Sequence, residues 1–175
     1  MDTGSTKSRQ ETNRDTKKIM KLNLGSGFVK IPGFINVDID KNVEPDMVAD
    51  IRDLKEIENE SVDEILASHV LEHFLQKETF GILREWYRVL KKEGIIYVIV
   101  PDINKIISDY TQGKANLCCL EKVILGSDQS ATEFMIHKNI FTRKKLKRFL
   151  IVTGYRDIID LPPQREYELG LGAIK

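Results

Sequence analysis

The feature that most constrains the fold is a series of short β-prone runs, each of which ends in glycine, serine or an acidic residue. The runs are residues 19–24, 34–40, 45–51, 61–68 and 94–102, and the residues at their ends are Gly25, Ser26, Gly27, Asp38, Asp40, Asp50, Ser68 and Asp102. Strands that alternate with helices or loops are typical of an α/β domain with a mostly parallel sheet. Ligands of such sheets bind at the carboxyl ends of the strands. The pattern therefore predicts a ligand site at these strand ends.

The segments between and after these runs favour helices and two further strands. Apolar residues recur at helical spacing in residues 80–90, and Gly94 is predicted to stop that helix. Further helices are expected at residues 103–110, 116–125 and 143–153, the last of them capped by Thr142. Residues 94–102 are apolar on both alternating sets, which predicts a strand buried on both faces. With closing strands at residues 156–161 and 167–174, we expect a doubly wound, mostly parallel seven-stranded sheet that ends in an antiparallel strand pair.

Length and composition indicate one domain behind a tail. Residues 1–18 are polar and lack periodicity, so we expect a disordered tail followed by a single domain over residues 19–175. Lys and Arg together equal Asp and Glu at 27 each, so no net field attracts nucleic acid or an anionic membrane. The longest apolar run, residues 95–100, is too short to span a bilayer.

Two further features of the sequence predict a cytoplasmic location. The N-terminus has no apolar core of a secretory signal. The two cysteines, Cys118 and Cys119, are adjacent, which makes a poor disulfide. We therefore expect them to be small buried hydrophobic residues in a reducing cytoplasm.

The ends of the first three runs have the chemistry of an adenosine pocket. Gly25-Ser26-Gly27 lets the backbone approach a ligand, but it lacks both the tail of a phosphate loop and the third glycine of a dinucleotide fingerprint. Asp38 can accept hydrogen bonds from a ribose diol. Asp50 can accept one from an adenine amino group, and Ile51 can flank the ring. Together these residues predict a pocket for an adenosine without a pyrophosphate.

Several motifs, from Lys21 onward, resemble those of the class I S-adenosylmethionine-dependent methyltransferases, in particular a small stand-alone bacterial branch. They are LNLGSG, NVDID, VADIRDL, VDEILASHVLEHF and REWYRVLKKEGIIYVIVPD. The resemblance implies a Rossmann-like fold, S-adenosyl-L-methionine as cofactor, and a small molecule or glycan precursor as methyl acceptor. It also allows a homodimer. In this family the methionine part is contacted by residues that correspond to Leu24, Gly25, Ser26 and Gly27. The ribose is contacted by the counterpart of Asp38, and the adenine by that of Asp50. The methyl-transfer face is lined by the counterparts of Ser68, His69 and His73.

The spacing of the first strands departs from that family. The stretch from Gly27 to Phe34 is too short for an ordinary crossover helix, and so is the stretch over residues 41–45. We therefore expect shortened crossovers, with the substrate side built from residues 102–142.

An oxygen acceptor would need a base near the transferred methyl group. His73, His137 and Asp102 are the candidates, because they follow the fourth and fifth strands or lie in the segment MIHKNIF, which could fold over the crevice. His137 could equally lie in a surface turn.

Residues His69 to His73 also spell H-x-x-E-H, the inverted zinc-peptidase signature. A zinc peptidase needs these residues in mid-helix and a third ligand elsewhere, whereas here they follow a predicted strand. We therefore predict no metal site. His69 alone could be a structural histidine under the cofactor. Two other classes stay open, a nucleotide-binding oxidoreductase or epimerase and a non-catalytic adenosine-binding module. The first should show G-x-G-x-x-G or Y-x-x-x-K, and the second needs no acceptor pocket.

Overall fold

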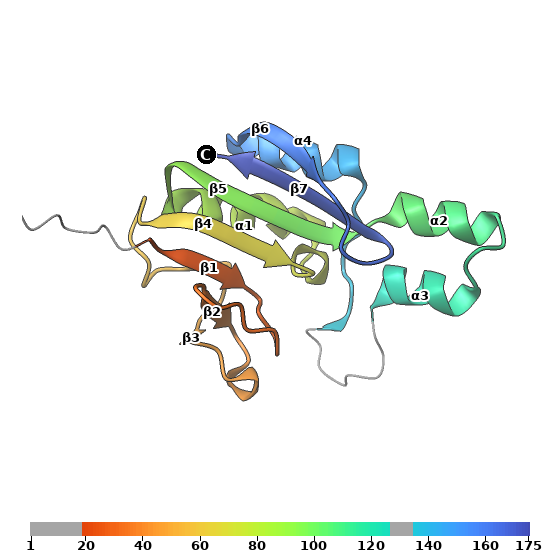
Figure 1. The fold of residues 1–175 in the computed structure, drawn as a ribbon, viewed down its shortest axis with the longest axis horizontal. Helices are drawn as coiled ribbons and strands as arrows, with labels where there is room; N and C mark the ends of the chain where they lie inside the picture. Colours follow the sequence, from red (N-terminus) through yellow and green to blue (C-terminus); the bar gives the residue numbers. More distant parts are fainter. Residues whose placement is uncertain (1–18, 127–134) are drawn as a thin grey trace, which may run out of the picture.

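A computed structural model describes residues 19–126 and 135–175 of the chain. The predicted tail, residues 1–18, and part of the expected substrate side, residues 127–134, lie outside the described residues. Seven strands form one sheet in the order β3-β2-β1-β4-β5-β7-β6 (Figure 1). They are β1 (Lys21–Leu24), β2 (Ile35–Asp38), β3 (Met47–Val48), β4 (Val62–Ser68), β5 (Leu90–Pro101), β6 (Arg156–Leu161) and β7 (Glu168–Ile174). Only β7 runs antiparallel to its neighbours, β5 and β6, which confirms the predicted fold class.

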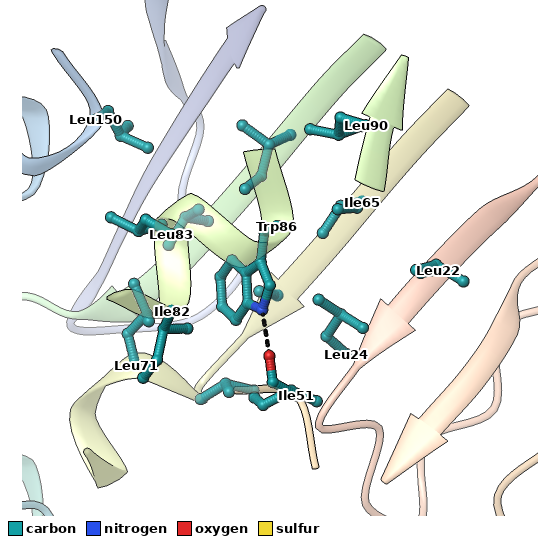
Figure 2. Packing of buried hydrophobic residues seen from close by; sticks show 14 of the residues in the cluster. Leu22, Leu24, Ile51, Ile65, Leu71, Ile82, Leu83, Trp86, Leu90 and Leu150 are labelled. Carbon is teal, nitrogen blue, oxygen red and sulfur yellow. Dashed lines mark hydrogen bonds between the residues drawn. The ribbon is translucent and has the colours of Figure 1, made fainter. Parts of the chain in front are cut away.

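Two helices cover one face of the sheet. Helices α1 (Gln76–Val89) and α4 (Arg143–Thr153) lie behind β4, β5 and β7 in Figure 1. Apolar side chains of α1 interlock there with those of the strands, as Figure 2 shows around Trp86. The Trp86 indole is fully buried, and its Nε1–H donates to the Ile51 carbonyl at 2.9 Å. This satisfied polar atom lets the largest side chain of the protein occupy the middle of the core.

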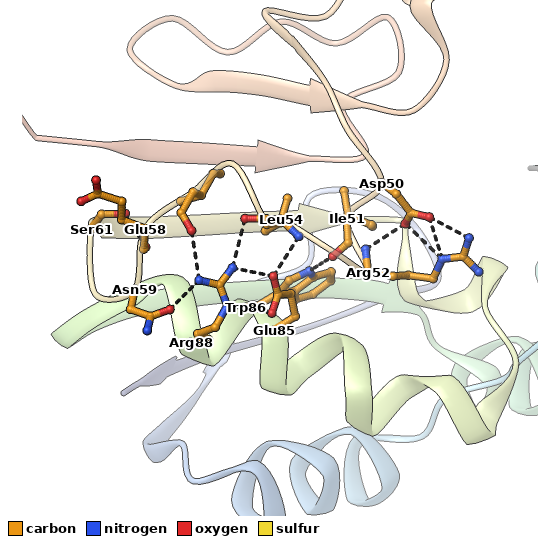
Figure 3. Close-up of polar contacts among 11 residues, drawn as sticks. Asp50, Ile51, Arg52, Leu54, Glu58, Asn59, Ser61, Glu85, Trp86 and Arg88 are labelled. Atoms are coloured by element: carbon orange, nitrogen blue, oxygen red, sulfur yellow. Dashed lines mark hydrogen bonds and ion pairs between the residues drawn. The ribbon is translucent and has the colours of Figure 1, made fainter.

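The loop between β3 and β4 takes the place of a crossover helix and is tied to α1 by side chains (Figure 3). The Arg88 guanidinium donates to the carbonyls of Leu54 and Ile57, at 3.0 Å each, and the Glu85 carboxylate accepts from the Leu54 amide at 2.8 Å. These bonds satisfy backbone groups that a helix would otherwise pair internally. Glu85, Trp86 and Arg88 of the REWYRVL motif therefore serve to hold this loop.

No helix of the described residues covers the opposite face, which is turned toward the viewer in Figure 1. The first crossover, residues 25–34, is a loop, and the second contains only the short 3-10 helix η1 (Lys41–Val43), as the spacing predicts. One prediction for β5 was therefore wrong. Ile96 and Val98 are fully buried, but Tyr97 and Ile99 on the other face are only half-buried.

Two other predictions are corrected outside the sheet. Helix α1 ends at Val89 and the chain passes directly into β5, so Gly94 does not stop a helix but lies within the strand. Helices α2 (Ile103–Thr111) and α3 (Leu117–Leu125) pack on each other beyond the end of β5 (Figure 1). Since α3 buries no residue, Cys118 is exposed and Cys119 half-exposed, not buried as expected. None of the helices in the described ranges is long and apolar enough to cross a membrane.

Candidate active site

The carboxyl ends of β1, β2 and β4 meet at one edge because these strands are parallel neighbours. Gly25 and Gly27 follow β1 with φ angles of 64° and 51°, which favour glycine. The two glycines have different surroundings. A Cβ on Gly25 would collide with Val70, whereas a Cβ on Gly27 would meet nothing within 4 Å. Gly25 is thus required by packing, and Gly27 leaves open space at the strand ends.

Asp38 lies beside that open space, and about half of the hydrogen-bond acceptor positions of its carboxylate are occupied. Oδ2 accepts from the Gly27 amide at 2.8 Å, and Oδ1 accepts from the Asp40 amide at 2.9 Å. A carboxylate offers about four acceptor positions, so each oxygen can take one further hydrogen bond. The two amides fix the carboxylate in position, and its remaining acceptors match the two hydroxyls of a ribose.

Asp50, the second predicted acid, is clamped by a residue that the sequence did not single out. The Arg52 guanidinium donates to both Asp50 oxygens, from Nε at 3.0 Å and from Nη2 at 2.7 Å (Figure 3). Its Nη1 donates to Glu78 at 3.3 Å. The hydrogen bond from Arg52 is the largest cause that lowers the Asp50 pKa. The carboxylate is therefore ionised and oriented, but part of its hydrogen-bonding capacity is taken. Ile51 next to it is buried, with its side chain in the core.

His69 follows β4 in a left-handed conformation, with a φ of 56°. Its Nδ1 lies 3.2 Å from Glu72 Oε1, and its Nε2 lies 2.9 Å from Glu168 Oε1. Glu72 and then Glu168 raise the pKa of His69 against the opposing effect of burial. A histidine held between two carboxylates favours the imidazolium form, so His69 is a structural cation and a poor base. Glu168 lies on β7, and its contact with His69 could not be predicted without the antiparallel pairing of β5 and β7.

The three candidate bases fall into two places. The rings of His73 and His137 lie together, with their centroids 5.1 Å apart. Asp102 instead caps α2, where its Oδ1 accepts from the amides of Asn104 and Lys105 at 3.0 and 3.3 Å. The structure therefore brings the two histidines together, while the Asp102 carboxylate is engaged by a helix end.

Residues 135–141 lie against the end of β4, where the sequence expected a covering segment. The amides of Lys138 and Asn139 donate to the Glu72 carbonyl at 2.7 and 3.0 Å. Asn139 is buried and donates from Nδ2 to the Thr79 hydroxyl at 3.2 Å. These bonds fix the segment on the 3-10 helix η2 (Leu71–His73) and hold His137 beside His73.

A basic hollow lies apart from these residues on α4. Arg143, Lys144, Lys147 and Arg148 line it together with Asn104 and Ile151, around an open volume of about 580 Å³. Leu146 and Leu150 on the other side of the helix are fully buried. The cations thus form the solvated face of an amphipathic helix.

Comparison with known proteins identifies this arrangement. Residues 22–98 match a family model described as a methyltransferase domain. The fold is similar to a SAM-dependent methyltransferase from Archaeoglobus fulgidus, with a TM-score of 0.62 and 16% identity over 91% of this chain and 87% of that one. It is also similar to a SAM-dependent methyltransferase from Methanosarcina mazei, with a TM-score of 0.60 and 18% identity over 91% and 92% of the two chains. Residues 22–98 therefore match the methyltransferase-domain family, and the fold of the chain is that of S-adenosylmethionine-dependent methyltransferases.

One further structure of this fold contains a cofactor product. It is the 1,6-didemethyltoxoflavin-N1-methyltransferase of Burkholderia thailandensis with bound 1,6-didemethyltoxoflavin and S-adenosylhomocysteine. Its TM-score is 0.57, with 14% identity over 89% of this chain and 70% of that chain. Among curated proteins, none matches the sequence. These comparisons support S-adenosylmethionine as the cofactor.

Proposed function

We propose that this protein transfers the methyl group of S-adenosylmethionine to an oxygen or nitrogen of a small molecule or glycan precursor. The observation that carries the proposal is the Asp38 carboxylate. The amides of Gly27 and Asp40 hold it in place, and it keeps two acceptor positions beside open space.

The binding residues then take separate roles along the strand ends. Asp38 accepts from the ribose hydroxyls, and Asp50 accepts from the adenine amino group. The Ile51 side chain, which the sequence predicts beside the ring, is instead part of the core. The backbone of Leu24, Gly25, Ser26 and Gly27 approaches the methionine part, while Ser68 and His69 line the face toward the methyl group. Leu24 and Ser26 are buried, whereas Gly25 and Gly27 are half-buried, so the two glycines offer the accessible backbone of this segment.

The chemistry requires alignment and the removal of one proton. The bound cofactor supplies a methyl group on a positively charged sulfur. The S–CH3 bond breaks as the acceptor's lone pair forms the new bond, and the acceptor's proton leaves to a base or to water. His73 and His137 are the favoured bases, since Asp102 caps α2 and His69 is held between carboxylates. Burial lowers the pKa of His137, which favours the neutral form that a base requires.

We also propose that the enzyme works in the bacterial cytoplasm without nucleic acid or membrane, and as a homodimer. The balanced charge supports the absence of nucleic acid, and the uncovered face of the sheet offers a surface for a second copy. Sedimentation at two protein concentrations tests the dimer.

Calorimetry tests cofactor binding. We expect binding of S-adenosylmethionine and S-adenosylhomocysteine but not of NAD, which separates this function from an oxidoreductase. Asp38→Ala should weaken binding by about 1.5–3 kcal/mol, the range for hydrogen bonds to a charged group. Asp40→Ala is the matched control, since its side chain accepts from Asn42 and not from the ribose. Equal losses in both variants would contradict the assigned ribose contact.

The acceptor is found by a radiolabelled-methyl screen against cell extract. With an acceptor in hand, His73→Ala and His137→Ala should lower turnover and leave cofactor affinity unchanged, because a base acts on the transition state. Normal turnover in both variants would exclude the two histidines as bases. A protein that binds cofactor but labels nothing would favour a non-catalytic adenosine-binding module.

A further inference from the structure

Glu72 is a buried acid whose carboxylate is left without hydrogen bonds. It is 1% exposed, and neither Oε1 nor Oε2 accepts a hydrogen bond from any described residue. The contact from His69 Nδ1 to Oε1, at 3.2 Å, is an ion pair whose direction does not meet hydrogen-bond geometry. Burying an ionised carboxylate is costly unless a charge or hydrogen bonds compensate it. His69 supplies a nearby charge but no hydrogen bond, so both oxygens of Glu72 keep lone pairs that a second cation could bind.

All three histidines of the chain surround Glu72. Two of them form a ligand set with it, since one ligand atom each from Glu72, His73 and His137 lie within 4.8 Å of one another. Ligands at about 2.1 Å from a metal ion lie roughly 3–3.5 Å apart in tetrahedral or octahedral geometry. From the upper limit of 4.8 Å, a closing of about 1.3–1.8 Å would bring these atoms to that separation.

The hydrogen bonds of the two histidines prepare one nitrogen of each ring for a metal. His73 Nδ1 lies 3.2 Å from the Ile136 carbonyl, and His137 Nδ1 lies 3.0 Å from the Val123 carbonyl. A carbonyl only accepts, so Nδ1 carries the proton in each ring and Nε2 keeps its lone pair. Metal-binding histidines in proteins usually have this outer hydrogen bond.

We propose that Glu72, His73 and His137 bind one divalent transition-metal ion. Two imidazoles and one carboxylate suit ions such as zinc, manganese or iron(II), whereas magnesium and calcium prefer oxygen ligands. Three protein ligands leave coordination positions open for water or for an acceptor oxygen. The sequence hides this set because two ligands lie in the H-x-x-E-H motif and the third comes from the segment that Lys138 and Asn139 fix on the Glu72 carbonyl.

This proposal departs from the prediction of no metal site made from the sequence, but the ligand set is still not that of a zinc peptidase. Its motif lies on the short η2 after a strand, and His69 is held away by Glu168. An imidazole that binds the ion cannot also take the acceptor's proton. With the ion bound, the metal in place of His73 or His137 would polarise an acceptor hydroxyl. The metal site does not depend on the proposed methyl transfer. Binding of the ion and binding of the cofactor can be measured separately.

The first experiment measures metal binding directly. Tag-free full-length protein is stripped with a chelator, dialysed, and titrated with Zn²⁺, Mn²⁺ and Co²⁺ by calorimetry, and the visible spectrum of the Co²⁺ form is recorded. We expect one ion to bind per chain. The visible spectrum of the Co²⁺ form should be that of cobalt bound by nitrogen and oxygen ligands. Glu72→Gln, His73→Ala and His137→Ala should each weaken binding more than the roughly 10–100-fold that changes around a metal site usually cost.

Two variants serve as controls. Glu121→Gln makes the same carboxylate-to-amide change on the exposed side of α3 and should bind like the wild type. His69→Ala should keep the ion, because His69 contacts Glu72 without belonging to the ligand set. Loss of the ion in His69→Ala with none in His137→Ala would overturn the assignment.

Thermal unfolding keeps the test independent of calorimetry and reports whether each variant folds. An ion at about 100 times its Kd should raise the wild-type Tm by roughly 5–10 °C. A folded Glu72→Gln variant should lack this rise. No rise and no binding in the wild type would mean that Glu72, His73 and His137 do not bind an ion, and the proposal would fail. Cofactor binding by the same metal-free sample is tested in parallel, so failure of one proposal does not affect the other.

Discussion

The two faces of the sheet are built from the same strands but have different surroundings, since helices cover one face and no described helix covers the other. Behind β5, Ile96 and Val98 lie fully buried against the helices. On the other face Tyr97 and Ile99 stay half-buried, and Ile159 of β6 is 59% exposed. The difference comes from the connections. Those after β4 and β5 contain helices, and those after β1, β2 and β3 do not contain an α-helix. Apolar strand sequence therefore does not by itself decide burial.

The covered face should contribute most of the stability. Trp86→Ala removes the largest core side chain and its hydrogen bond to the Ile51 carbonyl. We expect a loss of about 3–5 kcal/mol in the free energy of unfolding, measured by urea denaturation. Trp86→Phe is the control that keeps most of the ring and should lose clearly less. A loss below about 1 kcal/mol for Trp86→Ala would show that the helix-covered face does not dominate.

A pair of isoleucines within β5 compares the two faces directly. Ile96→Ala on the covered face should cost about 2–5 kcal/mol, while Ile99→Ala on the uncovered face should cost about 1 kcal/mol. Both changes remove the same atoms from one strand, so β-propensity cancels. Equal costs, growing with protein concentration, would show that a second copy of the chain covers this face.

The elements were predictable from sequence because each has a local signature. The strands lie in short apolar runs, and α4 has its Thr142 cap and a terminal Gly154 in a left-handed conformation. Local signatures fail where burial is decided by distant segments. The apolar sequence of α3 suggests buried cysteines, but this helix packs beyond the sheet and buries none of its residues.

In the candidate site, too, residues with a local signature were predictable and contacts between distant segments were not. Gly27 and Asp38 were predictable, because each ends a strand whose neighbours are known once the sheet is parallel. The partners Arg52 of Asp50 and Glu168 of His69 were not predicted. Glu168 is brought to His69 by the antiparallel register that places it opposite Pro101. His137 reaches Glu72 through backbone bonds from a segment far along the chain, which no spacing rule predicts.

The smallest expected effect lies at the end of the uncovered face, where His69 and Glu168 join β4 to β7. The pKa of His69 is raised, first by Glu72 and then by Glu168, so this histidine stabilises the fold fully below its unfolded pKa of about 6.5. That contribution is lost as the pH rises through the higher folded value. The His69 hydrogen bond lowers the pKa of Glu168 against burial, so the acid's contribution is lost only as the pH falls below about 4.3, its unfolded value, and through the folded one.

The free energy of unfolding should therefore contain a pair contribution that is largest between roughly pH 4.5 and 6.5 and declines above neutrality. Because the His69 side chain is 32% exposed, solvent screens the pair and the decline should be shallow. Urea denaturation from pH 5 to 9 should show this slope in the wild type and a flatter one in Glu168→Gln. The same slope in both would mean that Glu72 alone sets the charge of His69. The uncovered face would then be closed at this end by packing and not by the ion pair.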